Sequence, residues 1–291
     1  MSNPSSLALR AAPALFVLIW ATGFIVARLV APYADPLTFL MARYALAITV
    51  LTLAALLLRA SWPQGVRGWR DALIAGVLLH GFYLGGVFWA VHHGLPAAIS
   101  ALIGGLQPLL TAVLAAPLLG ETVTRRRWLG IGAGFAGAVL VIAPEIGTGT
   151  GFPAVTVVAA LIAMISMTLG TIWQKRTGAQ VDMRTNAVAQ FIGGALVTAP
   201  FAFFTEHGNL TINVPLIVGL LWSALGLSIG AITLLMILLR RGAVSGVASL
   251  FYLVPPATAL FAFFLFGDSL SPVQIGGMAL AALGVAIASR G

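Results

Sequence analysis

The sequence has no cysteine and few charged residues. Without cysteine, disulfide bonds, thiolate metal sites and cysteine nucleophiles are excluded. Asp, Glu, Lys and Arg make up 8% of the 291 residues, whereas they make up about a quarter of an average soluble domain. Hydrophobic residues make up 60% of the chain. This composition excludes a soluble globular protein and indicates one that is embedded in a membrane.

Ten apolar stretches account for most of the chain. A helix rises about 1.5 Å per residue, so about 20 apolar residues cross the hydrocarbon core of a bilayer. Most of the stretches are long enough, and the fifth and tenth are short. We expect spans at 11–30, 36–58, 72–93, 96–119, 128–143, 154–174, 186–204, 216–239, 243–266 and 273–289. The pattern predicts an all-α integral membrane protein with ten transmembrane helices.

The positive charges lie mostly on one side when the chain is threaded through these spans. Thirteen of the fifteen Lys and Arg residues fall on the side of the N-terminus, and the five opposite loops contain none. The positive-inside rule therefore predicts that both termini are cytoplasmic. Fourteen Arg against one Lys and a high Ala content indicate a bacterial source, so we expect the inner membrane. The formal charge of +8 is then explained by orientation and by anionic headgroups, so we expect the lipid bilayer as a partner and no nucleic acid.

The sequence repeats itself weakly at an offset of about 147 residues. Arg43 corresponds to Gln190, and Pro108 corresponds to Pro255. The predicted units are residues 1–147 and 148–291, each with five spans. Because five is an odd number, the two halves must cross the membrane in opposite directions. An inverted 5+5 repeat is typical of secondary transporters, which bind substrate near the bilayer midplane.

Short motifs in the first half resemble those of one transporter group. They are the WxxGFxxxR string of Trp20, Gly23, Phe24 and Arg28, the pair Gln107-Pro108, and the pair Gly120-Glu121. The chain resembles EamA-type members of the drug/metabolite transporter superfamily over its whole length. This resemblance implies a basket of ten helices around a central cavity that is lined by helices 1, 3, 4, 6, 8 and 9. Within the superfamily the chain looks like a YddG-type amino-acid exporter.

Prolines lie at mid-depth in two spans that correspond in the repeat. Pro108 is near the centre of the fourth span, and Pro255 and Pro256 are near the centre of the ninth. Each proline removes a backbone hydrogen bond and frees carbonyl groups. We expect hinges for alternating access or carbonyls that line the cavity, while a tolerated kink is the structural alternative.

Polar and aromatic side chains mark a candidate substrate site. His80 and Tyr83 lie near mid-depth in the third span, where an ionisable group is costly. Helical spacing places the polar residues of the fourth and ninth spans on one face of each helix, which predicts a cavity wall or a helix seam. The candidate substrate-binding residues are His80, Tyr83, Gln107, Ser100, Ser249, Tyr252, Trp20 and Trp173. The tryptophans have the alternative role of interface anchors.

The charged residues inside or near the spans narrow the substrate class. Arg43 lies about two turns into the second span, and we expect it to extend outward toward Asp35; a buried anion clamp is the other interpretation. All seven acidic residues lie at span ends or in loops. Small multidrug exporters of this superfamily use a membrane-embedded Glu, so this chain departs from their pattern. A neutral, zwitterionic or aromatic substrate fits the remaining residues better.

Several alternatives stay open at this stage. A carrier of sugar-nucleotides would need buried Lys or Arg for the phosphates, and only Arg43 is near such a position. An intramembrane enzyme is disfavoured: residues 226–230 match GxSxG around Ser228, but in a membrane helix without the required turn. We expect no metal and no cofactor, and a monomer with a dimer as the alternative.

Small residues also mark a packing face on two of the spans. Gly130 and Gly134 in the fifth span are echoed by Gly277 and Ala281 in the tenth. Small residues at four-residue spacing allow two membrane helices to approach closely. The sequence therefore predicts a small-residue packing face on each of these helices.

Overall fold

The computed structural model of the chain is helical throughout its described part, apart from one isolated antiparallel bridge between Ala34 and Leu210. It describes residues 4–95, 100, 103–120, 122–146, 152–178, 181–242, 244–267 and 270–289. The helical elements are α1 Pro4–Val30, α2 Pro36–Leu57, α3 Gly65–Gly76, η1 Val77–Phe82, α4 Tyr83–His92, α6 Gln107–Leu119, α7 Arg125–Ile146, α8 Ala154–Thr177, α9 Met183–Thr205, α10 Val214–Trp222, η2 Ser223–Ala231, α11 Ile232–Arg241, α12 Val244–Ser249, η3 Leu250–Leu253, α13 Val254–Phe266 and α14 Pro272–Ser289.

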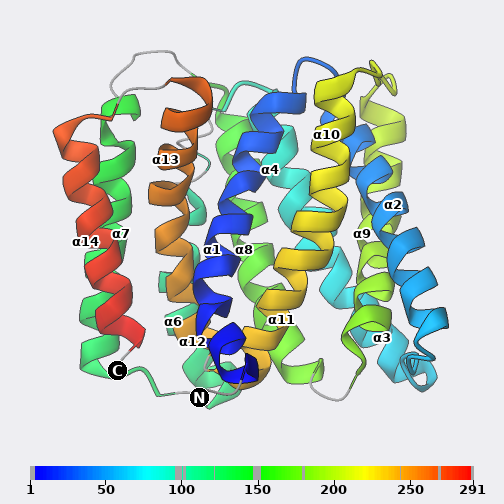
Figure 1. Cartoon of the computed structure of the whole chain (residues 1–291), viewed down its shortest axis with the longest axis horizontal. Helices are drawn as coiled ribbons and strands as arrows, with labels where there is room; N and C mark the ends of the chain where they lie inside the picture. The colour runs from blue at the N-terminus through cyan, green and yellow to red at the C-terminus, as the bar shows by residue number, and fades with distance from the viewer. Residues whose placement is uncertain are drawn as a thin grey trace.

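These elements join into ten rods that run side by side (Figure 1). The segments α3–η1–α4, α10–η2–α11 and α12–η3–α13 each form one continuous crossing. Seven helices of the described residues are long and apolar enough to span a membrane, and α6 and α14 are shorter apolar helices. The predicted all-helical membrane fold with ten helices is confirmed. The predicted boundary between residues 147 and 148 lies outside the described residues.

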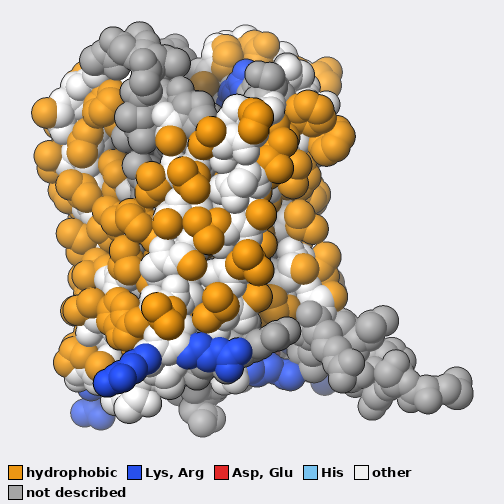
Figure 2. All heavy atoms as spheres, turned by 90° about the vertical axis from the view of Figure 1, so that its left-hand side faces the viewer, with side chains coloured by type: hydrophobic (Ala, Val, Ile, Leu, Met, Phe, Trp, Pro, Cys, Tyr) orange, Lys and Arg blue, Asp and Glu red, His pale blue; other side chains and the backbone are white. Residues whose placement is uncertain are grey.

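The surface of the bundle separates into an apolar belt and a basic end. Both termini lie at the same end of the bundle in Figure 1. Figure 2 shows hydrophobic side chains over most of one side, with most of the visible Lys and Arg side chains along the edge at that end. We call the end of the bundle that holds both termini the basic end, and the other end of the bundle the opposite end. The described basic residues of the basic end are Arg59, Arg67, Arg70, Arg125, Arg126, Arg127, Lys175, Arg176, Arg184, Arg240 and Arg241.

The helices α7 and α14 lie side by side at one edge of the bundle (Figure 1) and pack through glycines. A Cβ atom on Gly130 would lie 2.4 Å from the Ala288 nitrogen, and one on Gly137 would lie 2.3 Å from the Ala281 nitrogen. Such approaches are possible only without a side chain. The small-residue faces predicted on the fifth and tenth spans are confirmed, and the structure shows that the two faces pack against each other.

Irregular turns interrupt the helices at positions that correspond in the repeat. Residues 77–82 (η1) and 223–231 (η2) are π-helical. Residues 105–106 form a turn before α6, and the 3₁₀ segment η3 precedes α13. Pro108, Pro255 and Pro256 therefore lie in the first turn of a new helix, where a missing N–H costs little. The breaks at the prolines are present, and their role as hinges stays a prediction.

Candidate functional site

A cavity of about 280 Å³ enters the bundle from the opposite end. At its mouth lie Ala31 and His92, which are both exposed, and at its deep end lie Trp20, Arg43 and His80. Its walls come from α1, α2, η1, α4 and η2, with Ile232 of α11. The cavity therefore extends from one surface of the membrane to about mid-depth.

A hydrophobic cluster closes the bundle between the cavity and the basic end. Trp20 and Tyr83 pack on this cluster from the cavity side. Its buried members include Phe16, Leu235, Leu239, Val244 and Val247. In the described part of the chain the cavity is thus sealed toward the basic end by apolar side chains.

Aromatic rings form the deep wall of the cavity. Trp20 and Tyr83 stack with their ring centroids 6.4 Å apart and their planes 14° apart, and Phe251 meets Trp20 edge-on at 5.2 Å. Trp20 and Tyr83 also line a second, smaller cavity of about 40 Å³, together with Ser100 and Pro255. These two rings therefore separate the two cavities.

His80 is fully buried in the π-helical segment η1. Its ring stacks on Phe191 at 4.4 Å, and its backbone carbonyl accepts a 2.8 Å hydrogen bond from the Tyr44 hydroxyl. Within the described residues neither ring nitrogen makes a hydrogen bond of good geometry, although the Gln190 amide lies near enough to interact. His80 thus lines the cavity with unused hydrogen-bonding capacity.

The structure corrects the expectation for Arg43. Its side chain is 4% exposed, and it lines the cavity instead of extending to Asp35. Arg43 Nε donates a 2.7 Å hydrogen bond to Ser228 Oγ of η2. This bond holds the guanidinium inside the bundle, while Asp35 is bonded to the backbone of His207 and Asn209. The sequence analysis did not predict Ser228 as the partner of Arg43. It considered Ser228 only as a nucleophile in the GxSxG match, and that role was rejected.

Asp35 is bonded to the loop after α9. It accepts hydrogen bonds from the backbone N–H groups of Asn209 at 2.9 Å and His207 at 3.2 Å. Burial raises the pKa of the Asp35 carboxyl. The hydrogen bonds from Asn209 and His207 and the charge of His92 together lower this pKa by more than burial raises it, so the net shift is downward.

Four other candidate residues line neither cavity in the described structure. Gln107 Nε2 donates to Thr111 Oγ1 at 3.1 Å, and Ser249 Oγ donates to a backbone carbonyl in its own helix. Tyr252 is buried against α7, where a Cβ on Gly134 would meet its ring. Trp173 Nε1 donates to the Asp71 carbonyl at 3.0 Å, near the basic end.

The structure thus brings together Trp20, His80 and Tyr83, with Ser100 in the adjoining small cavity. Their role in binding, and that of the four residues placed elsewhere, stays a prediction. Sequence reasoning missed Phe39 and Phe88, which stack 6.1 Å apart in the cavity wall. Single apolar aromatics carry no signal in a chain this hydrophobic.

Comparisons with known proteins identify the family. The sequence profile of the EamA-like transporter family matches twice, at residues 11–143 and 154–290. An "Uncharacterized inner membrane transporter YedA" of Escherichia coli (strain K12) is 29% identical over 266 residues, covering 90% of this chain and 84% of that protein. The "Uncharacterized transporter YvbV" of Bacillus subtilis (strain 168) is 28% identical over 250 residues, covering 83% and 78%. "Protein PecM" of Dickeya dadantii (strain 3937) is 28% identical over 266 residues, covering 89% and 85%.

A solved structure, described only as "Crystal structure of protein", has the same fold. It superposes with a TM-score of 0.81 at 21% identity, covering 97% of this chain and 96% of that one. The two family matches cover the two halves of the chain, in agreement with an inverted repeat. The chain is therefore a membrane transporter that belongs to the EamA-like transporter family.

Proposed function

We propose that this transporter exports amino acids, aromatic and other neutral ones, or related small metabolites across the bacterial inner membrane by alternating access. The observation that carries the proposal is the cavity, which is open at the opposite end and sealed toward the basic end. One of the two states that alternating access requires has this form. The resemblance to YddG-type exporters supports amino acids as the substrate class, and family membership excludes the enzyme interpretation.

The chemistry of the cavity suits a small amphipathic substrate. Trp20, Phe24 and Tyr83 offer apolar faces, while Arg43 and His80 offer polar groups at the deep end. A few polar groups in a mostly apolar pocket fix the orientation of a ligand. The volume of about 280 Å³ is near the lower limit of small-molecule sites, about 300 Å³. An amino acid fits such a site better than a sugar-nucleotide.

The orientation is part of the proposal. The positive-inside rule places the basic end in the cytoplasm. The cavity would then face the outside, so the structure would represent the state after substrate release. The relative YedA is described as an inner membrane transporter, which supports the same location here.

Counterflow in proteoliposomes tests the substrate class. Vesicles loaded with unlabelled phenylalanine, leucine or threonine should accumulate the same labelled amino acid transiently, and vesicles without protein should not. If no member of a full amino-acid panel exchanges and a sugar-nucleotide does, the proposed substrate class is wrong.

Alanine substitutions test the proposed site. Loss of one hydrogen bond to a charged ligand group costs about 1.5–3 kcal/mol, which corresponds to roughly ten- to a hundredfold in affinity. We expect losses of this size for His80→Ala and Tyr83→Ala at unchanged thermal stability. The same substitution at Gln107 and at Tyr252 decides whether residues outside the described cavities contribute. If all four variants transport normally, the site lies elsewhere.

A further inference from the structure

We infer that Arg43, held by Ser228, binds a carboxylate group of the substrate at the deep end of the cavity. The inference rests on the proposed function and narrows it to small organic anions and zwitterions that carry a carboxylate on an apolar or aromatic body. Neutral amides and cationic amines of the same shape, which lack the carboxylate, would be rejected. The charge, the surroundings and the repeat each support this assignment.

Arg43 is a buried cation with most of its donors unused. Arg43 is only 4% exposed, and it lines the cavity. A guanidinium group carries five N–H donors in a planar fork. The described residues take one of them, through the 2.7 Å bond from Nε to Ser228 Oγ. The remaining donors are those that pair with a carboxylate in a two-bond arrangement.

No acidic side chain lines the cavity among the described residues. Four acidic side chains that the structure describes are bonded elsewhere: Glu206 to the start of α2, Asp35 to the loop after α9, Asp71 to Arg70, and Asp182 to Arg184. A charge buried in a membrane is costly unless it is paired. An anionic ligand supplies the missing charge, and protein groups around Arg43 do not compete with it.

The internal repeat offers a comparison within the same molecule. At an offset of 147 residues Arg43 corresponds to Gln190, and Ala27 corresponds to Gln174. In the second repeat Gln190 Nε2 donates to Gln174 Oε1 at 2.5 Å, so the two side chains are bonded to each other. In the first repeat the partner is replaced by Ala27, which lines the cavity. Ala27 and Arg43 both line the cavity, so the first repeat has a short side chain at the position where the second repeat has a bonded glutamine.

The neighbouring walls define the rest of the ligand. Trp20 and Tyr83, stacked 6.4 Å apart, present an aromatic surface beside the deep end, and Phe24 and Leu227 extend it. A ligand with its carboxylate on Arg43 would lay an apolar side chain on these rings. His80 also lines the cavity, and both of its ring nitrogens are buried without a hydrogen-bond partner among the described residues.

Binding to purified, detergent-solubilised protein tests the inference. The probes are labelled 3-phenylpropanoate, which has a carboxylate and no amine, and labelled phenylalanine; the competitors are the corresponding amides. We expect both carboxylates to bind, and the amides to compete at least tenfold more weakly. Arg43→Gln, which introduces the residue found at the repeat position, should weaken carboxylate binding ten- to a hundredfold and remove the discrimination against amides.

Two further variants separate the charge from folding. Arg43→Lys keeps the charge without the planar fork and should retain part of the affinity. Arg70→Gln makes the same exchange at an exposed position of the basic end and should bind like the wild type. The inference would be overturned if Arg43→Gln had a lower melting temperature than the wild type and Arg43→Lys discriminated against amides no better than Arg43→Gln does.

The outcomes distinguish this inference from the proposed function. Binding of 3-phenylpropanoate that depends on Arg43, without counterflow of any amino acid, would support the anion site and refute amino-acid export. Amino-acid counterflow that is unchanged in Arg43→Gln, with equal competition by amides, would support export and overturn the anion site.

Discussion

Glu206 Oε2 accepts two hydrogen bonds from Thr38, one from its backbone N–H at 2.7 Å and one from its hydroxyl at 2.8 Å. Glu206 Oε1 accepts a third from the Leu37 N–H at 2.8 Å. A carboxylate at the end of α9 thereby satisfies the free N–H groups at the start of α2, in the other half of the chain. Together with the bonds of Asp35 to Asn209, it joins the two halves at the opposite end.

We expect Glu206→Ala to destabilise the protein by about 1–2 kcal/mol, because it leaves the N-terminus of α2 without its acceptor. Unfolding in mixed micelles would measure the free energy. Thr38→Val removes only the hydroxyl bond and should cost less. If the double variant shows the sum of the two single effects, the two side chains are not coupled and the interpretation is wrong.

Asp35 should make stability at the opposite end depend on pH in the acidic range. Its pKa lies below the ordinary value of 3.8 in the folded protein. The ionised carboxylate therefore stabilises the fold above the unfolded-state pKa, and this contribution is lost as pH falls through the folded-state pKa. Melting temperatures should fall less steeply below pH 4 in Asp35→Asn than in the wild type. Parallel curves for the two proteins would contradict the assignment.

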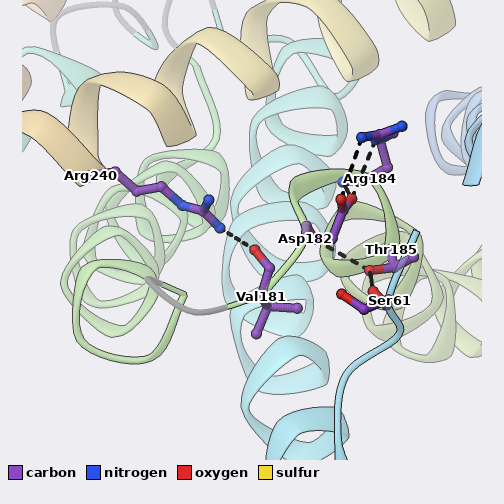
Figure 3. A network of polar contacts seen from close by, with 6 residues as sticks. All are labelled: Ser61, Val181, Asp182, Arg184, Thr185 and Arg240. Atoms are coloured by element: carbon purple, nitrogen blue, oxygen red, sulfur yellow. Dashed lines mark hydrogen bonds and ion pairs between the residues drawn. The ribbon is translucent and has the colours of Figure 1, made fainter. Parts of the chain in front are cut away.

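At the basic end, side chains tie helix ends to backbone carbonyls. Lys175 Nζ donates to the carbonyls of Leu239 and, at 2.8 Å, Gly242, at the C-terminus of α11. Arg240 donates to Val181 and, at 2.7 Å, to Gly178. Figure 3 shows Arg240 directed at the Val181 carbonyl and, nearby, Asp182 with Arg184 and Thr185 with Ser61. An opening of the basic end would have to break some of these bonds.

Removing Lys175 should therefore favour a state that is open at the basic end. A single cysteine in place of Val247, which is 6% exposed below the cavity, would report this opening. In Lys175→Met we expect an impermeant thiol reagent added from the basic side to label it severalfold faster. Arg176→Met, a substitution at the exposed neighbour, is the control. Equal labelling in both variants would show that Lys175 does not hold this end closed.

The close packing of α7 on α14 predicts opposite effects for two glycines of α7. A Cβ on Gly137 would lie 2.3 Å from the Ala281 nitrogen and 2.6 Å from the Gly277 carbonyl, whereas one on Gly132 meets nothing within 4 Å. We expect Gly137→Ala to destabilise by about 1–3 kcal/mol through overpacking. Gly132→Ala should be neutral or stabilise by up to about 1 kcal/mol through helix propensity. Unfolding free energies of the same sign and size would contradict the packing.

The sequence was sufficient for the fold because span length and charge asymmetry are properties of whole segments. It was less informative about the site, because it does not say which helices are neighbours. Gln107 and Thr111 share a helix face as predicted, yet they bond to each other at 3.1 Å and line neither cavity. The π-helical segments around His80 and Ser228 also change the residue spacing, so a 3.6-residue period misplaces side chains beyond them.

The helix breaks could be predicted from the sequence because they depend on neighbouring residues, whereas the direction of Arg43 depends on a distant part of the chain. Each proline marked its break because a missing N–H acts on the adjacent turn. Arg43 was misplaced because its direction depends on η2, which begins 180 residues later (223 − 43). The repeat pairs Arg43 with Gln190, and the structure shows that both positions are buried.

The absence of native cysteine allows a direct measurement of orientation. Val66 is 86% exposed at the basic end, and Ile212 is 80% exposed at the opposite end. In intact cells an impermeant thiol reagent should label Ile212→Cys and spare Val66→Cys, because the basic end is expected to face the cytoplasm. Permeabilised cells, in which both should react, provide the control. The reverse pattern in intact cells would turn the cavity toward the cytoplasm, and the structure would then represent the state that loads substrate for export.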